Sequence, residues 1–357
     1  MPIARFGRIL IPCAALVLGA CSSFGPGRLN HDQLDYSRAL NDASKRQTLA
    51  NIVGVRYADS PGFLSVSQVI AAYTFERSGN AILNSAGAGS NASYAQLGGS
   101  AAFSNRPTFT FTPVTGDAYA TSYIRPLSPS LVLPLAQGGV PIDLLLRIAV
   151  QSIGRLQNSS ALGGPHSEGS PGFFRLLAAL RRLQLAGVAN VRYRQTDNGG
   201  HVYLSLDPSM RRPNPQIESD TRDVRQMLGL SDRQTDYEIV YGHSTEPDVV
   251  TVTTRSVQGI LATLGAQIEV PAEDIERHDT MPTVGLVGGE TRPTIVVHNG
   301  ARPAPGAFAD IVYRGRHFWI EQSDFDSKFA LSVVQNLIAL AAITQNDKTP
   351  VVTIPAS

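Results

Sequence analysis

Residues 170–206 read SPGFFRLLAALRRLQLAGVANVRYRQTDNGGHVYLSL and contain two different spacings of apolar residues. Ser170 and Pro171 are typical of a helix start, and leucine or phenylalanine then recurs every three or four residues until Gly187. Beyond that glycine, apolar and polar residues alternate around the turn-forming sequence Asp197-Asn198-Gly199-Gly200. This stretch therefore predicts a helix followed by an antiparallel hairpin.

The same two patterns continue through the rest of the chain. Helices are expected at residues 36–57, 141–156, 220–228, 256–266 and 326–344. Strands are expected at residues 63–75, 108–112, 237–241, 248–253, 294–298, 311–313 and 318–321. Helices and antiparallel hairpins are mixed without a regular βαβ order, so the expected fold class is α+β.

A loop rich in glycine and serine, residues 158–172, divides the expected elements. It separates an N-terminal α+β region, residues 34–157, from a C-terminal α+β region, residues 173–357. Such loops occur both at internal boundaries and inside single domains, so both interpretations stay open.

The N-terminus has the pattern of a secretory signal. Arg5 and Arg8 are followed by an apolar run from Ile9 to Leu18, which is too short to span a bilayer as a helix. We therefore expect residues 1–20 to be a signal peptide that is removed. Residues 21–33 are then expected to form a short polar tether.

The sequence Leu18-Gly19-Ala20-Cys21 directly follows the apolar run. It resembles the lipobox of bacterial lipoproteins, which implies cleavage between Ala20 and Cys21 and attachment of fatty acid such as palmitate to the Cys21 thiol. Each buried methylene of such a chain contributes roughly 0.8 kcal/mol of membrane affinity. Ser22 follows the cysteine, and with it the resemblance implies an outer-membrane location facing the periplasm. The alternative is a Cys21 buried in an apolar N-terminal helix.

Composition excludes several classes of protein. The other cysteine, Cys13, would be lost with the signal peptide, so neither a disulfide nor a catalytic thiol is expected. Loss of Arg5 and Arg8 would change the formal net charge from +1 to about −1, and near-neutral charge gives no electrostatic case for nucleic acid. Membrane attachment is expected through Cys21 alone, because no later apolar run approaches the roughly 20 residues of a spanning helix.

Motifs that carry catalysis are absent from the sequence. It contains no H-E-x-x-H, C-x-x-C, G-x-S-x-G or G-x-x-x-x-G-K-[ST] pattern, so no catalytic residue, metal or cofactor is predicted. The densest titratable cluster, residues 273–279, could serve acid/base chemistry or a hard cation, but a solvated helical turn is the commoner structure. Five arginines are similarly interpreted as a solvated face, with an anionic partner or lipid headgroup as the alternative; they are Arg175, Arg181, Arg182, Arg192 and Arg194.

Residues 78–105, SGNAILNSAGAGSNASYAQLGGSAAFSN, consist almost wholly of small and amide residues. One interpretation is a flexible loop between two strands, because this composition buries little apolar surface. The other is a long β-hairpin that faces a partner or lipid, since membrane-spanning strands alternate apolar with small or polar residues.

Four stretches resemble a group of uncharacterised proteobacterial outer-membrane lipoproteins. They are Gln33–Ser37, Leu49–Asp59, Arg106–Asp117 and Ser327-Lys328. The resemblance would cover most of the mature chain. It implies no catalytic residue, because no activity is established for the group.

The leading functional hypothesis is therefore a lipid-anchored envelope protein that binds or scaffolds an envelope protein partner, or associates with itself. One alternative is a subunit of an oligomeric outer-membrane pore or export assembly, with residues 63–112 supplying its strands. Another is an envelope hydrolase that uses the carboxylates of residues 273–279.

Overall fold

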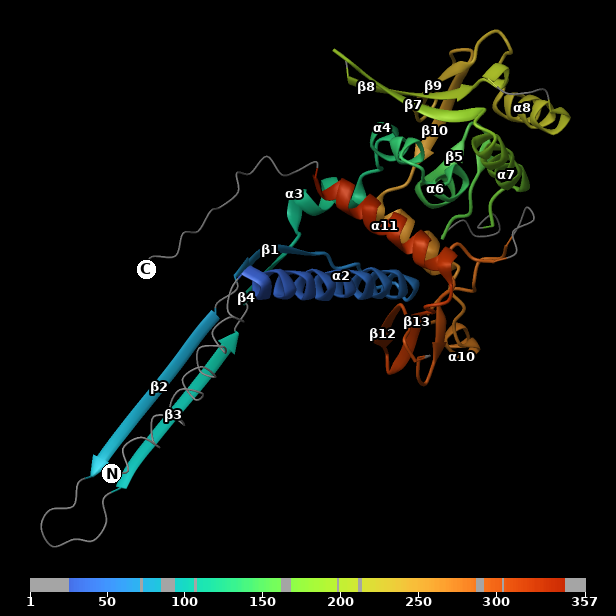
Figure 1. The fold of residues 1–357 in the computed structure, drawn as a ribbon. Helices are drawn as coiled ribbons and strands as arrows, with labels where there is room; N and C mark the ends of the chain where they lie inside the picture. The colour runs from blue at the N-terminus through green and yellow to red at the C-terminus, as the bar shows by residue number, and fades with distance from the viewer. Residues whose placement is uncertain are drawn as a thin grey trace, which may run out of the picture. The chain divides into compact units, whose positions relative to one another are not determined.

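The computed structural model describes residues 26–70, 73–84, 94–105, 108–161, 168–197, 199–210, 214–286, 292–303 and 305–343 (Figure 1). The chain folds as two compact units. Unit 1 contains the residues up to Pro61 and from Asp117 onward, and unit 2 contains Gly62–Gly116. Helices, a mixed six-stranded sheet and an antiparallel three-stranded sheet occur together without a βαβ repeat, which confirms the α+β class.

The six-stranded sheet of unit 1 has the order β6-β5-β10-β9-β8-β7. Its strands are β5 (Val150–Ile153), β6 (Leu156–Gln157), β7 (Ala189–Thr196), β8 (Gly199–Leu206), β9 (Asp236–Tyr241) and β10 (Val249–Thr254). Only the β9–β10 pair is parallel. Val250 and Val252 of β10 are buried and their neighbours less so, which is the alternation expected of a pleated strand.

The helix and hairpin expected in residues 170–206 are confirmed. In α7 (Pro171–Leu185) the Ser170 hydroxyl accepts the Phe173 N–H, and the apolar residues Phe173, Leu176, Leu177, Leu180 and Leu183 are buried. Thr196 of β7 pairs with Gly199 of β8, so the two strands are separated by only two residues in the sequence.

Residues on both sides of the expected boundary at 158–172 belong to unit 1. The Ser170 N–H donates to the Gln157 carbonyl at 2.8 Å, and β5 pairs with β10. The chain therefore divides at Gly62–Gly116 and not at this loop.

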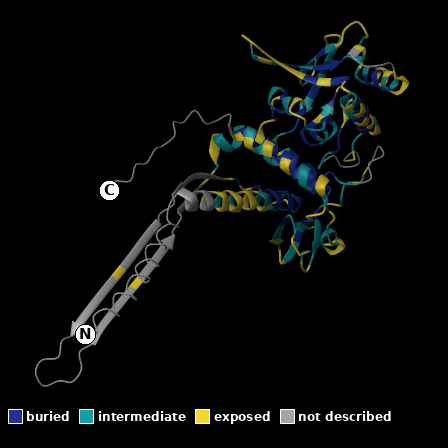
Figure 2. Ribbon diagram, viewed as in Figure 1, coloured by how far each residue is buried: buried dark blue, intermediate teal, exposed yellow. Residues whose placement is uncertain are grey.

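A second group of elements in unit 1 contains α2 (Pro26–Arg56), α9 (Val257–Ala266), α10 (Ala272–Glu276) and α11 (Phe325–Ile343), with the sheet β11 (His298–Gly300), β13 (Arg316–Ile320) and β12 (Ala309–Tyr313). Figure 2 shows α2 changing from exposed to buried toward its C-terminal end, where Leu49, Ile52 and Val53 are fully buried. Because α2 begins at Pro26, part of the tether expected at residues 21–33 is helical.

The remaining elements of unit 1 are two helices of moderate length, α6 (Ile142–Ala149) and α8 (Pro215–Leu228), and several short ones. The short ones are α3 (Gly116–Tyr119, which begins at the last residue of unit 2), the π-helix η2 (Ala120–Ile124), α4 (Pro129–Val132), α5 (Pro134–Gln137) and the 3₁₀-helix η4 (Pro208–Met210). Throughout the described part of the chain, no helix combines the length and hydropathy that a membrane crossing needs.

Unit 2 consists of two antiparallel strand pairs. β1 (Leu64–Ile70) pairs with β4 (Thr108–Pro113), and β2 (Tyr73–Asn84) pairs with β3 (Tyr94–Asn105). The second pair continues residue by residue from Tyr73 opposite Asn105 to Asn84 opposite Tyr94. The described parts of residues 78–105 are thus paired strands and not an open loop, whereas residues 85–93 lie outside the described chain.

Candidate functional site

A pocket of about 420 Å³ lies in unit 1 at the C-terminal end of α2. Four separate parts of the chain line it: the end of α2 with the residues after it, Ala161, one side of α9, and the segment after α10. The lining residues are Val55, Arg56, Ala58, Asp59, Ser60, Ala161, Gln258, Ala262, Ala266, His278, Asp279, Thr280 and Met281.

Two of the helices that end at this pocket, α2 and α10, are followed by a left-handed residue other than glycine. After α2, the Asp59 N–H donates to the Gly54 carbonyl at 2.9 Å, and Ala58 has φ 65°. After α10, the Asp279 N–H donates to the Asp274 carbonyl at 2.9 Å, and His278 has φ 61°. Glycine usually occupies this position because a Cβ there costs roughly 1–2 kcal/mol. Both strained residues line the pocket.

Gly265 brings α9 close enough to α2 to form the pocket wall. A Cβ at Gly265 would lie 2.8 Å from the Ile52 carbonyl oxygen and 3.4 Å from the Arg56 nitrogen. Any larger residue would force the two helices apart, because real Cβ atoms essentially never approach a backbone oxygen as closely as 2.8 Å. The glycine therefore permits the close crossing that covers Arg56.

Hydrogen bonds attach the segment after α10 to the C-terminal ends of α2 and α9. The Thr280 hydroxyl donates to the Arg56 carbonyl at 2.6 Å, and the Val284 N–H donates to the Ala266 carbonyl at 2.9 Å. The Thr283 hydroxyl donates to the Ile268 carbonyl at 3.1 Å. Backbone and hydroxyl contacts thus hold this wall of the pocket in place.

Arg56 is the unusual side chain of the pocket. It is only 7% exposed, and its guanidinium makes one hydrogen bond among the described residues, from Nη2 to the Thr283 hydroxyl at 3.1 Å. Its Nε is buried without a partner, and no described carboxylate forms an ion pair with it. Burial lowers the pKa of Arg56 below its ordinary value, because the charged form is poorly solvated. A guanidinium with five N–H donors is therefore left mostly unbonded beside a cavity.

The cluster at residues 273–279 forms ion pairs beside the pocket. Arg277 donates to the carboxylates of both Asp274 and Asp279, the latter at 3.1 Å from Nε. Asp274 also accepts the Tyr57 hydroxyl at 2.7 Å, and Nη1 of Arg314 lies 3.8 Å from Asp279. Burial and the bond to Asp274 raise the pKa of Tyr57. The structure thus brings together Asp274, Arg277 and Asp279, and leaves Glu273 and Glu276 exposed on α10.

Asp59, the other acid of the lining, is also engaged. It accepts the hydroxyl of Tyr313, at the end of β12. Because Asp59 and Asp279 each have another partner, neither neutralises Arg56.

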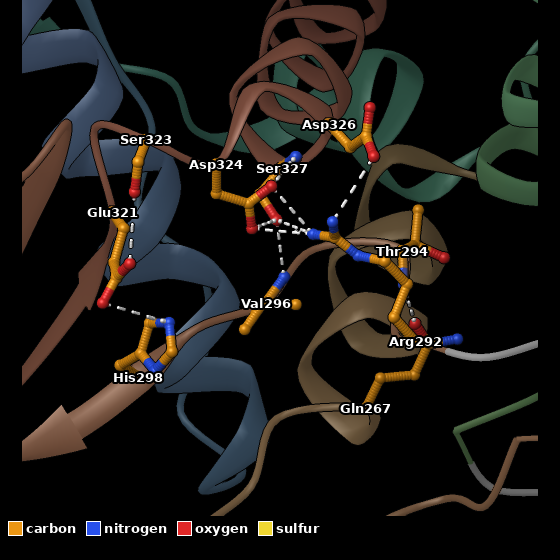
Figure 3. A network of polar contacts seen from close by, with 10 residues as sticks. All are labelled: Gln267, Arg292, Thr294, Val296, His298, Glu321, Ser323, Asp324, Asp326 and Ser327. Atoms are coloured by element: carbon orange, nitrogen blue, oxygen red, sulfur yellow. Dashed lines mark hydrogen bonds and ion pairs between the residues drawn. The ribbon is translucent and has the colours of Figure 1, made fainter.

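A second polar network lies at the start of α11 (Figure 3). Nη2 of Arg292 donates to Asp324 at 2.7 Å and to the Ser327 hydroxyl at 2.9 Å, and that hydroxyl also accepts the Val296 N–H at 2.8 Å. The Ser327 N–H in turn donates to Asp324 at 3.1 Å, as in a helix N-cap. Ser327 is fully buried, and its described partners are an arginine, an aspartate and a backbone amide. This network therefore attaches residues 292–296 to α11 and has the geometry of a structural cap.

The residues expected to carry the lipid lie outside the described part of the chain. Acylation of Cys21 and cleavage after Ala20 stay predictions. No group of three or more potential metal ligands occurs within the described ranges.

Of the five arginines interpreted as a solvated face, several have acidic partners. Arg182 forms a bidentate pair with the buried Asp220, with both distances 2.7 Å. Arg192 and Arg194 lie 3.2 Å and 3.7 Å from Asp236.

Arg56 was not a candidate on sequence grounds, although a signal exists. It comes four residues after the buried Ile52 and three after Val53, so helical spacing places a charge on the apolar face of α2. No family model, curated protein or solved structure matches this chain. Its function must therefore be inferred from its own geometry.

Proposed function

We propose that this protein is a lipid-anchored envelope protein that acts by binding, and that the pocket beside Arg56 is its binding site. Acylated Cys21 would hold the protein in the outer membrane, facing the periplasm. The observation that carries the proposal is a buried guanidinium with a single hydrogen bond, adjoining an open cavity.

The composition of the pocket supports a binding role. Small-molecule sites are clefts of roughly 300–1,000 Å³ with mostly apolar walls and a few placed polar groups. Here the volume is about 420 Å³, and Val55, Ala262 and Ala266 supply apolar wall. Arg56 and Gln258 supply polar groups. A partner's side chain or chain end could enter such a site as well as a small molecule.

Photo-cross-linking in intact cells tests this proposal. A photoreactive residue at Met281, which is 63% exposed and lines the pocket, should capture an envelope component. The matched control is Leu185, 71% exposed at the end of α7. Capture at 281 should disappear in Arg56→Met. Equal capture at both positions, or capture that Arg56→Met does not change, would contradict a binding role for the pocket.

The anchor has its own test. Cys21→Ser should release the protein from the membrane fraction and prevent labelling by palmitate, because the thiol that carries the fatty acid is gone. A Cys21→Ser protein that still sediments with envelopes would contradict the anchor. That result would not bear on the proposal that the pocket is a binding site.

The register of β2 and β3 favours a second candidate function, that of a subunit in an oligomeric outer-membrane pore or export assembly. Phe75 pairs with Phe103 and Ala81 with Leu97, whereas Ser78 pairs with Ser100, at the opposite parity along the strand. Directly paired positions share a face, so the positions of Phe75, Ala81 and Leu83 fall on one face together with Arg77. The positions of Glu76, Ser78 and Asn80 fall on the other face together with Ile82. The hydroxyls of Ser78 and Ser100 are 2.7 Å apart. Each strand has 12 residues, enough to cross a bilayer, for which about 9–11 are needed.

This pattern supports the alternative of an oligomeric outer-membrane pore or export assembly, to which each copy contributes a hairpin. Substitutions at two neighbouring positions of β2, which lie on opposite faces of the strand, test this assembly. Ala81→Arg should abolish a heat-labile oligomer extracted in detergent, because a charge at the lipid face costs roughly 2–4 kcal/mol. Asn80→Arg, on the opposite face, should leave the oligomer intact. Equal effects at 80 and 81, or a monomeric wild type, would exclude the assembly.

A further inference from the structure

We propose that the pocket beside Arg56 takes a monocarboxylate with a short apolar body, and that Arg56 is the residue that pairs with the carboxylate. This inference rests on the proposed binding function and names the class of ligand. No described residue supplies a counter-charge to Arg56, and the ligand would supply it.

The free donors of Arg56 suit a carboxylate. Only Nη2 donates to a described group, the Thr283 hydroxyl, and the buried Nε has no partner. A planar guanidinium binds carboxylates through parallel N–H···O bonds, and these charge-assisted bonds are stronger than neutral ones. Because Nε is itself buried, an anion in the pocket would meet the guanidinium at Nη1, which makes no hydrogen bond to a described residue and is not enclosed as Nε is.

The charge around the pocket favours a single negative charge. Asp59 and Asp279 line the same cavity, and a second charge on the ligand would face them. The cations that could balance it are engaged, since Arg277 binds Asp274 and Asp279 and Arg314 also pairs with Asp279. A phosphate dianion therefore fits the pocket less well than a carboxylate.

The walls favour a short apolar body. Val55, Ala161, Ala262 and Ala266 line the cavity with small side chains, and Met281 adds a flexible one. The volume of about 420 Å³ is at the lower end of the range for ligand pockets. A carboxylate with a side chain of leucine size fits within this volume and leaves room for a further part of a chain. Both a free small acid and the last residue of a peptide have this chemistry.

The probes for the test are N-acetyl-leucine and N-acetyl-leucinamide, which differ only in the charge. Calorimetry with the full chain should show binding of the acid and about tenfold or more weaker binding of the amide. The Nε–H resonance of Arg56, identified by its loss in Arg56→Met, should shift on addition of the acid. Equal binding of acid and amide, or tighter binding of inorganic phosphate, would overturn the inference.

Variants test whether binding of N-acetyl-leucine depends on Arg56. Arg56→Met should reduce binding of N-acetyl-leucine about tenfold or more. Arg46→Met, the same change at an exposed position of α2, should not change it. If Arg56→Met does not fold, Arg56→Lys replaces it, and its loss of the planar fork should still weaken binding. Equal affinities of wild type and the folded Arg56 variant would contradict the inference.

Two further probes distinguish the source of the carboxylate. Tighter binding of N-acetyl-Ala-Ala-Leu than of N-acetyl-leucine would assign the site to a peptide C-terminus, and the reverse order would assign it to a small acid. Either order supports the monocarboxylate class. Capture at position 281 in cells together with equal binding of acid and amide would leave the proposed function standing and remove only this inference.

Discussion

Two regions of unit 1 each contain a buried arginine, and the two arginines differ in how many hydrogen bonds their guanidinium groups make. Arg255 is 5% exposed and Arg56 is 7% exposed, so their accessible surfaces are nearly equal, although burial lowers the pKa of Arg255 more strongly. Arg255 donates to the carbonyls of Arg147 at 2.9 Å and Ile148 at 3.1 Å, and also to that of Ser159. Arg56 donates to one hydroxyl. The two arginines therefore differ above all in their hydrogen-bond partners, which are three carbonyls for Arg255 and one hydroxyl for Arg56.

Local structure explains why Arg255 is satisfied. Arg147 and Ile148 are at the end of α6 (Ile142–Ala149), where carbonyls lack helical partners and carry partial negative charge. Burial lowers the pKa of Arg255 to about 9, so the side chain stays charged at pH 7. A cation among these carbonyls acts as a cap. Removing it would take a donor from the carbonyls of Ile148 and Ser159, whereas the Arg147 carbonyl would keep its bond from Nδ2 of Asn158 at 2.9 Å.

The largest expected effect is therefore that of Arg255→Met. It should lower the free energy of unfolding by about 3 kcal/mol, because buried carbonyls lose their donors. Urea denaturation at pH 7 measures this loss. An unchanged midpoint would mean that the carbonyl bonds contribute little, and the contrast with Arg56 would have no energetic basis.

Arg56→Met should not destabilise the ligand-free protein. Replacing a poorly bonded buried charge with an apolar side chain should leave the free energy of unfolding unchanged or raise it by up to about 1 kcal/mol. The same urea titration gives the value, with Arg46→Met as the control. A loss as large as that of Arg255→Met would show that Arg56 has a structural role too.

Gly265→Ala tests the packing that covers Arg56. The added Cβ would lie 2.8 Å from the Ile52 carbonyl oxygen, so α9 must move away from α2, and we expect a loss of about 1–3 kcal/mol. Gly259→Ala, on the same helix with its closest contact at 3.4 Å, is the control and should cost less. Equal losses at the two positions would show that the helix crossing does not depend on Gly265.

Ala58→Gly addresses the strained end of α2 beside the pocket. It should raise the free energy of unfolding by about 1 kcal/mol, because glycine adopts φ 65° without the Cβ clash. α8 is the control, because it already ends in glycine: Gly229 has φ 70° and open space around it, so Gly229→Ala should cost a similar amount. Thermal unfolding compares both variants with wild type. A loss of stability in Ala58→Gly would contradict strain at this position.

A further effect concerns pH. Burial and the bond to Asp59 raise the pKa of Tyr313 to about 12 from its usual value near 10. The folded state then holds this proton more tightly than the unfolded state, so its contribution is complete below pH 10 and falls as the pH rises toward 12. Tyr313→Phe should flatten this part of the stability profile. The same slope in wild type and variant would assign it to other groups.

The sequence predicted many local elements, but the helix expected at 141–156 was wrong in its second half: α6 ends at Ala149, and β5 and β6 follow it. The helix and hairpin at 170–206 form where expected, because capping, apolar spacing and turn residues agree there. The strand expected at 294–298 is instead β11 at His298–Gly300. Side chains explain the difference, since Gln267 accepts the Thr294 N–H and Ser327 accepts that of Val296.

The spacing and composition of neighbouring residues did not predict the candidate site either. The acidic cluster at 273–279 was visible as a run of charges, but its pairing with Tyr57 and Arg314 joins segments far apart in the chain. Arg56 belongs to a stretch with ordinary helical spacing, and the residues beside it do not show that no carboxylate will pair with it.

The α+β class, the α7–β7–β8 unit and the lipobox-like N-terminus could all be derived from the amino acids alone, because helical spacing, turn chemistry and signal features each act over a few neighbouring residues. The pocket and the state of its arginine could not. Whether a charge is solvated depends on groups brought to it through space, and here they come from Gly265, Thr283 and the ends of two helices far apart in the chain. Folding alone placed Arg255 among carbonyls and Arg56 beside a cavity.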